Sequence, residues 1–198
     1  MIKLITQAFR QKIIWIVVCG VFYPLAMTAV IQLAFPDKAN GSLVMRDGKL
    51  VGSELMAQQF TGAKYFWPRP SAATYGTGPS GIAGSSGSNF GPTSAQLQTN
   101  VRGNAKALRD AAKLPADAPV PADLVYASAS GLDPHISPAA ALFQVGRVAA
   151  ARGMPEDKVR ALVEQHVEPP QWGFLGEARV NVLLLNLALD AADAKKSG

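Results

Sequence analysis

The segment SGLDPHISP, residues 130–138, gathers residue types that acid–base chemistry uses. Asp133 and His135 stand two positions apart, and Ser130 and Ser137 lie on either side of them. A carboxylate can orient an imidazole that then moves protons, although a hydrolase built on this dyad would still need a nucleophile. The segment therefore raises the hypothesis of a hydrolytic or ligand-binding site that uses Asp133 and His135.

The same residues also have structural explanations. Pro134 places Asp133 and His135 in a turn, where an aspartate side chain commonly accepts backbone hydrogen bonds. Ser137-Pro138 is typical of a helix start, because the serine oxygen can accept from an early N–H and proline fits the first helical position. We favour turn bracing, with a partner contact as the second interpretation and catalysis as the third.

Metal binding has little support in this sequence. A zinc site needs three or four ligands. The chain has two histidines, His135 and His166, and its one cysteine, Cys19, lies in an apolar segment. We therefore expect no metal and no disulfide in the region after that segment.

A second candidate is the glycine–serine segment at residues 76–91, GTGPSGIAGSSGSNFG. It lacks the Gly-Lys-Ser/Thr ending of a phosphate-binding loop, and no apolar strand leads into it. Loops of this length are uncommon unless they are functional or mobile, so a partner-binding role stays open.

The elements that would position these residues are mostly helices. We expect a hairpin around Asp47-Gly48, a short helix at 53–60, and a rigid extended strip at 65–70 where residues precede prolines. Further predicted elements are a helix that is capped by Thr93 or Ser94 and runs to about Lys113, a short strand at 124–128, a helix at 138–152 ended by Gly153, and helices at 155–166 and 181–192. The last of these follows a strand at 179–182, with Asn181 as its N-cap.

Residues 13–35 form an uncharged apolar run of 23 residues. At 1.5 Å per residue it would be about 34 Å long, enough to cross a hydrocarbon core of about 30 Å. The run is longer than the core of a signal peptide and no Ala-x-Ala site follows it, so we favour an uncleaved anchor over a signal peptide. Pro24 should kink this helix, and Gly20 allows a neighbouring helix to approach closely.

The charge distribution separates the anchor from the rest of the chain. The net charge is +5, but sixteen basic and all fourteen acidic residues lie after Phe35, which leaves only +2 there. This balance argues against nucleic acid as a partner. Arg10 and Lys12 stand directly before the apolar run, so we expect the N-terminus in the cytoplasm and the long C-terminal region outside.

Nine stretches together resemble one known family. They are FYPLA at 22–26, ANGSL at 39–43, GSELMAQQF at 52–60, YFWPRPSA at 65–72, GSNFGPT at 87–93, PVPADLV at 119–125, SASGLDPHISPAAA at 128–141, RVAAARG at 147–153 and RVNVLLLNLALD at 179–190. In this order they resemble the C subunit of the Kdp potassium-transporting ATPase. The likeness runs from the anchor to about Asp190.

The resemblance implies an accessory, non-catalytic subunit of a high-affinity potassium uptake pump in the bacterial inner membrane. The implied partners are a channel-like potassium-binding subunit, a P-type ATPase subunit that carries the catalytic residues, a small F subunit and the lipid bilayer. The family is described as raising the ATP affinity of the ATPase subunit. ATP would then act at the level of the complex, with no cofactor assigned to this chain.

One family motif is altered here. The family's Ser-Gly-Gly-Ser-Asn segment has been likened to a nucleotide-binding loop, but residues 85–89 read Ser-Ser-Gly-Ser-Asn. A region outside the membrane also cannot reach cytoplasmic ATP. We therefore expect any effect on ATP affinity to pass through the anchor or through the complex.

The sequence thus predicts one transmembrane helix followed by a helix-rich extracytoplasmic α+β domain. The expected boundaries are 1–12 for a cytoplasmic arm, 13–35 for the transmembrane helix and 36–198 for the outer domain. The alternative function is a membrane-anchored extracytoplasmic hydrolase or ligand-binding module. The candidate motif or subunit-contact residues are Gly20, Pro24, Trp67, Arg69, Ser88, Asn89, Asp133, His135 and Asn181.

Overall fold

The computed structural model of the chain describes residues 1–73 and 84–194. Contacts divide the chain into two compact units, Met1–Val51 and Gly52–Gly198. Residues 76–83 of the predicted glycine–serine loop lie outside the described residues. The mixed α+β architecture with one long apolar N-terminal helix confirms the predicted fold class.

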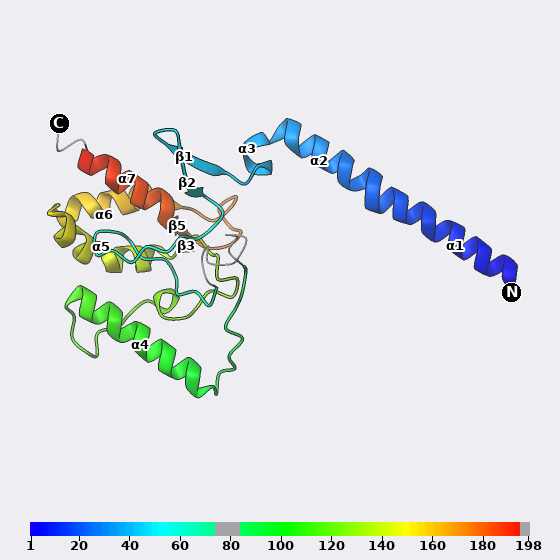
Figure 1. The fold of residues 1–198 in the computed structure, drawn as a ribbon. Helices are drawn as coiled ribbons and strands as arrows, with labels where there is room; N and C mark the ends of the chain where they lie inside the picture. Colours follow the sequence, from blue (N-terminus) through cyan, green and yellow to red (C-terminus); the bar gives the residue numbers. More distant parts are fainter. Residues whose placement is uncertain (74–83, 195–198) are drawn as a thin grey trace. The chain divides into compact units, whose positions relative to one another are not determined.

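The N-terminal unit is dominated by one long helix (Figure 1). It consists of α1 (Ile2–Val17), a π-helical turn η1 (Val18–Phe22) and α2 (Tyr23–Ala34). The helix has 33 residues, its most apolar 18-residue window has a mean hydropathy of 2.2, and none of its side chains is buried within the chain. A helix this apolar, whose side chains no other part of the chain covers, is stable in an apolar environment. It therefore associates the chain with a membrane.

The π-helical turn lies directly before Pro24. The Tyr23 N–H donates to the Val18 carbonyl, five residues back instead of four. Proline has no N–H and its ring normally clashes with the carbonyl four residues earlier, here that of Gly20. The wider turn gives the ring room, so the helix continues through Pro24 (Figure 1). The kink expected at Pro24 stays a prediction.

A short helix and a hairpin complete this unit. After α3 (Pro36–Ala39), β1 (Leu43–Arg46) pairs with β2 (Lys49–Ser53) in a two-stranded sheet. Asp47 and Gly48 have φ values of 52° and 74°. Two consecutive positive φ values are what a tight type I′ hairpin turn requires, so the predicted hairpin is confirmed.

The second unit contains four main helices and a small sheet. The helices are α4 (Ala95–Ala112), α5 (Pro138–Arg152), α6 (Glu156–Gln165) and α7 (Val182–Ala194), with a 3₁₀ turn η2 (Ala122–Leu124) between α4 and α5. In Figure 1, α6 lies between α5 and α7, and α4 lies on the other side of α5. The strands are β3 (His135–Ile136), β4 (Val167–Glu168) and β5 (Arg179–Asn181).

The three strands form an antiparallel sheet with β5 in the centre. His135 pairs with Asn181, and Ile136 pairs with Val180. On the other edge, Val167 also pairs with Val180. The Asp133–His135 turn is therefore fixed directly at the start of an edge strand.

Helix ends are set by the signals that the sequence contains. The Ser94 hydroxyl accepts from the Leu97 N–H at the start of α4, and the Ser137 hydroxyl accepts from the Ala140 N–H at the start of α5. Gly153 ends α5 with a φ of 58°. These contacts confirm the predicted helix boundaries.

Aliphatic side chains of α5, α6, α7 and β5 supply most of the core. Together with Ile136 of β3, the valines and leucines among them that are at most 2% exposed are Val145, Val148, Val159, Val163, Val180, Val182, Leu183, Leu185 and Leu189. The aromatic ring of Phe66, in the extended strip at residues 65–70, is also fully buried. The strip is therefore part of the core and not a surface linker.

Two predicted elements are wrong. Residues 53–60 form a turn followed by an irregular segment instead of a helix. The Ala57 N–H, which a helix starting after Ser53 would direct to the Ser53 carbonyl, donates to the Leu132 carbonyl instead. Residues 124–128 form the end of η2 and an irregular segment instead of a strand, with the Ser128 N–H donating to the Pro70 carbonyl.

Candidate functional site around Asp133

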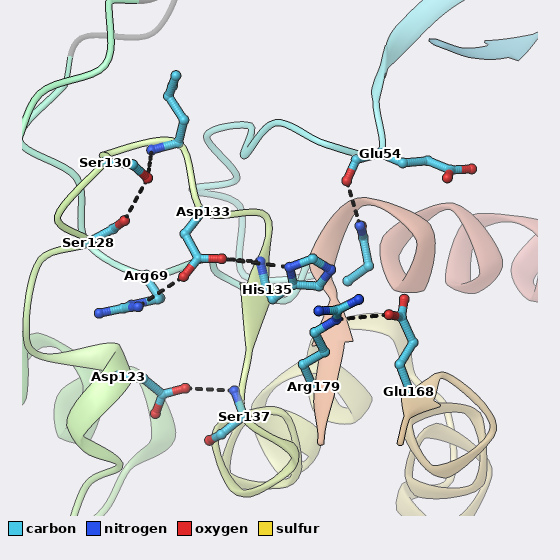
Figure 2. A network of polar contacts seen from close by, with 12 residues as sticks. Glu54, Arg69, Asp123, Ser128, Ser130, Asp133, His135, Ser137, Glu168 and Arg179 are labelled. Atoms are coloured by element: carbon cyan, nitrogen blue, oxygen red, sulfur yellow. Dashed lines mark hydrogen bonds and ion pairs between the residues drawn. The ribbon is translucent and has the colours of Figure 1, made fainter. Parts of the chain in front are cut away.

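Asp133 links the extended strip to the turn that precedes β3 (Figure 2). Its Oδ2 lies 2.9 Å from Nη1 of Arg69. Its Oδ1 accepts the backbone N–H of His135 at 3.0 Å and lies 3.7 Å from the imidazole Nδ1. The predicted bracing of the turn by Asp133 is confirmed, and the ion pair with Arg69 adds a long-range contact that the sequence did not indicate.

The surroundings of Asp133 favour its charged form. The pKa of Asp133 is lowered from 3.8 to about 2, mainly by the His135 side chain, with further lowering by the His135 backbone N–H and Arg69, while burial acts in the opposite direction. At 3.7 Å the imidazole contact is longer than a hydrogen bond, so the two shorter contacts define the geometry. A carboxylate with so low a pKa binds a proton weakly and is a poor general base near neutral pH.

A cavity of about 360 Å³ opens beside this cluster, lined by Arg69, Asp123, Asp133, His135, Ile136, Ser137, Glu177, Ala178 and Arg179. Several of its polar groups are engaged with one another. Oδ2 of Asp123 accepts the Ser137 N–H at 2.7 Å, and Arg179 pairs with Glu168 at 2.9 Å (Figure 2). These contacts fix the start of α5 and the β4–β5 pair.

The cluster lacks the geometry of a nucleophilic hydrolase. Among the described residues, no hydroxyl group forms a hydrogen bond with the imidazole of His135. The hydroxyl of Ser137 accepts from the N–H of Ala140 at the start of α5. The described residues also contain no group of three or more His, Cys, Asp or Glu side chains that could hold a metal ion.

Two buried amides hold the strip to which Arg69 belongs. Asn186 accepts the Phe66 N–H at 2.8 Å and donates to the Phe66 carbonyl at 3.0 Å. Gln144 does the same for Trp67, at 2.8 Å and 3.2 Å. Each side-chain amide thus makes the two hydrogen bonds that a neighbouring β-strand would make to one residue of the strip. The backbone N–H and carbonyl of that residue are satisfied although the strip belongs to no helix or sheet.

A buried arginine completes this arrangement. The guanidinium of Arg147 donates to the carbonyls of Ala63 and Tyr65 and to Oε1 of Gln144. It also lies 3.9 Å from the centroid of the Trp67 ring, within the range of a cation–π contact. Burial lowers the pKa of Arg147 to about 10, so it stays charged at neutral pH.

The glycine–serine region meets the Asp133 loop at close range. The Ser86 N–H donates to the Ser130 carbonyl at 2.9 Å, and the Ser71 hydroxyl donates to the Gly131 carbonyl at 2.8 Å. Gly131 has a φ of 69°, and a Cβ there would lie 2.6 Å from Cβ of Ala73 and 2.7 Å from the Ser86 carbonyl. A side chain at position 131 is excluded by both backbone conformation and space.

The structure separates the candidate residues into different settings. Gly20 and Pro24 belong to the N-terminal unit, and all the others belong to the second unit. Arg69, Asp133 and His135 form the cluster, and Trp67 lies beside Arg147. Ser88 is half-buried, Asn89 is exposed with a φ of 53°, and their role as contact residues stays a prediction.

Asn181 has the predicted capping role and a second contact. Its Oδ1 accepts the Leu184 N–H at 3.2 Å, and its Nδ2 donates at 2.8 Å to the carbonyl of Glu54, the residue labelled in Figure 2. Sequence reasoning missed Gln144, Arg147 and Asn186. The available signal was polar residues at positions that helical periodicity assigns to the apolar faces of α5 and α7.

Comparison with known proteins gives the family. Residues 5–191 match the model of KdpC, described as the c chain of a K⁺-transporting ATPase. The chain belongs to the KdpC family. It is 58% identical over 172 residues to the potassium-transporting ATPase KdpC subunit of Polaromonas naphthalenivorans (strain CJ2), which covers 87% of this chain and 86% of the relative. The KdpC subunit of Methylococcus capsulatus (strain Bath) is 51% identical over 195 residues, which covers 96% and 99%.

Membership of the KdpC family confirms the resemblance found in the sequence. It also places the Arg69–Asp133–His135 cluster in a protein type defined by assembly into an ATPase. The contacts of Asp133 agree with that setting, because its carboxylate accepts a backbone N–H and pairs with Arg69. The hydrolase alternative is not favoured by either line of evidence.

Proposed function

We propose that this chain is the accessory subunit of a high-affinity, ATP-driven potassium uptake pump. Its membership of the KdpC family over residues 5–191 carries the proposal. Catalysis would reside on a separate P-type ATPase subunit. In support, the present sequence contains no Asp-Lys-Thr-Gly phosphorylation motif and no phosphate-binding loop.

The proposed partners are the channel-like potassium-binding subunit, the P-type ATPase subunit and the small F subunit. The long apolar helix would cross the inner membrane once. Arg10 and Lys12 before residues 13–35 support a cytoplasmic N-terminus, with residues 36–198 on the extracytoplasmic side. In that topology ATP would be contacted only by the partner subunits.

An effect on ATP affinity would then be a coupling through the complex. A subunit that binds one conformation of a pump more tightly than another shifts the pump toward that conformation, and the ligands of that conformation bind more tightly in turn. This chain would supply the binding energy through its anchor and outer domain. It would not need a nucleotide site of its own.

The test is purification of a tagged copy of the chain from its own membrane in mild detergent, followed by an assay of potassium-stimulated ATPase activity. We expect two large membrane proteins to co-purify and ATPase activity to be lost when this chain is removed. Recovery of the chain alone, with an ATPase that works equally well without it, would refute the proposal.

A further inference from the structure

The loop between β4 and β5 displays the two most exposed large apolar side chains of the described part of the second unit. Trp172 is 78% exposed and Phe174 is 73% exposed, and Leu175 beside them in the sequence is 45% exposed. We call these three residues the apolar tip. Large aromatic side chains that are this exposed on one loop usually mark a surface that another molecule covers.

The tip is held in one conformation by backbone hydrogen bonds. Gln171 and Leu175 exchange both N–H to carbonyl bonds at 2.9 Å, and the Gly173 N–H donates to the Pro170 carbonyl at 2.9 Å. Trp172 has a φ of 54°, in the left-handed region that a bulky residue rarely adopts. The hydrogen bonds of the loop thus hold Trp172 in an unfavourable backbone conformation, in which its side chain is exposed.

The charges beside the tip help to identify what covers it. Residues 167–178 contain two acidic residues, Glu168 and Glu177, and no lysine or arginine. Arg179 neutralises Glu168 across the β4–β5 pair, which leaves Glu177 next to the tip. A site built for an anionic bilayer surface would carry basic residues here, whereas an acidic flank complements a protein surface with basic groups.

We propose that the apolar tip docks into an apolar groove of another subunit of the same potassium-transporting ATPase, with a lysine or arginine of that subunit facing Glu177. The inference rests on the proposed function, since it assumes that the assembled pump exists. Two aromatic side chains bury about 300–500 Å² together, which is less than one partner's share of a standard interface. The tip is therefore the anchor of a larger contact.

The experiment uses the full-length chain in the intact complex, with a photoreactive benzophenone amino acid at position 172. A matched control carries it at position 126, where Tyr126 is 48% exposed in the same unit. Illumination of the purified complex should join position 172 to another ATPase subunit, and position 126 should give much less of that adduct. An adduct to lipid, an adduct to a second copy of this chain, or no adduct at position 172 in an intact complex would each overturn the inference.

A second measurement checks the energetic role. The Trp172→Ser, Phe174→Ser double variant should reduce the fraction of complex retained after dilution at least about tenfold, as expected when anchor residues are removed. Tyr126→Ser is the control and should have little effect. The thermal midpoint of the isolated chain should not fall in the double variant, because both side chains are exposed, and a lowered midpoint would refute the docking interpretation.

The charge of the flank gives a separate readout. Glu177→Lys should slow association and reverse its salt dependence, because it would place a cation opposite a cation. If the wild-type chain fails to co-purify with the ATPase, the proposed function itself fails. If the wild-type complex forms and the tip variants assemble equally well, only this inference fails.

Discussion

Replacing Asp133 by asparagine isolates the charge of the cluster. Asparagine keeps a side-chain oxygen that can accept the His135 N–H, but it cannot form an ion pair with Arg69. The fall of the Asp133 pKa from 3.8 to about 2 sets an upper limit of about 2.4 kcal/mol on the stabilisation. The side chain is 29% exposed and solvent screens the pair, so we expect Asp133→Asn to cost about 1–1.5 kcal/mol at pH 7.

The pH dependence gives the sharper test. Since the pKa of Asp133 is lower in the folded chain than in the unfolded chain, acidification protonates the unfolded chain first. The stabilisation is therefore complete above about pH 4 and is lost as the pH falls towards about 2. The difference in stability between wild type and Asp133→Asn should shrink over that window.

The assay is thermal unfolding of the full chain in a non-ionic detergent, followed by near-ultraviolet circular dichroism between pH 2.5 and pH 7. At neutral pH the midpoint of the variant should lie about 3–5 °C below that of the wild type. Asp117→Asn makes the same chemical change at an exposed position and should alter the midpoint by less than about 1 °C. A midpoint difference for Asp133→Asn that stays constant down to pH 2.5, or that equals the Asp117→Asn difference, would refute the reasoning.

Three further variants, with Gly103→Ala as a control, test the structural contacts around the site in the same thermal assay. Asn186→Leu should lower stability by about 2–5 kcal/mol, because the Phe66 N–H and carbonyl both lose a buried partner; a loss below about 1 kcal/mol would contradict the proposed amide pairing. Gly131→Ala should lower the free energy of unfolding by about 2–4 kcal/mol, because position 131 has a positive φ and the new Cβ would lie 2.6 Å from Cβ of Ala73. Gly103→Ala, in α4 with no atom within 4 Å of the new Cβ, should raise the free energy of unfolding by about 0.5–1 kcal/mol. Ser137→Ala should cost about 1 kcal/mol by removing the N-cap of α5, and an unchanged midpoint would show that the cap is dispensable.

The parts of the fold that the sequence predicted correctly depend on local chemistry. Ser94 and Ser137 cap helices, Gly153 ends one, and Asp47-Gly48 turns a hairpin, each through contacts within about four residues of itself. Asp133 bracing its own turn belongs to the same class. Such contacts can be inferred from a residue and its neighbours without knowledge of the tertiary structure.

The failures have the opposite cause. Residues 53–60 have helical periodicity, but the Ala57 N–H bonds to the carbonyl of Leu132, which is distant in sequence. The amides of Asn186 and Gln144 bind backbone groups of the strip more than seventy residues away. No pattern along one chain indicates which buried side chain will satisfy which backbone group, because that depends on how the helices pack.

A substitution of Asp133 could lower the ATPase activity of the complex in two ways, by destabilising the folded chain or by removing a chemical group. Its polar groups fix backbone and pair with Arg69, and its carboxylate is too weak a base for proton transfer near neutral pH. Loss of Asp133 should therefore act on ATPase activity only through the stability of the folded chain. Activity of a complex that carries Asp133→Asn should approach the wild-type value at 15 °C and fall below it as the temperature nears the lowered midpoint. A proton-transfer role would instead give a loss that persists at low temperature in fully folded, fully assembled complex, and that result would restore a chemical role for the cluster.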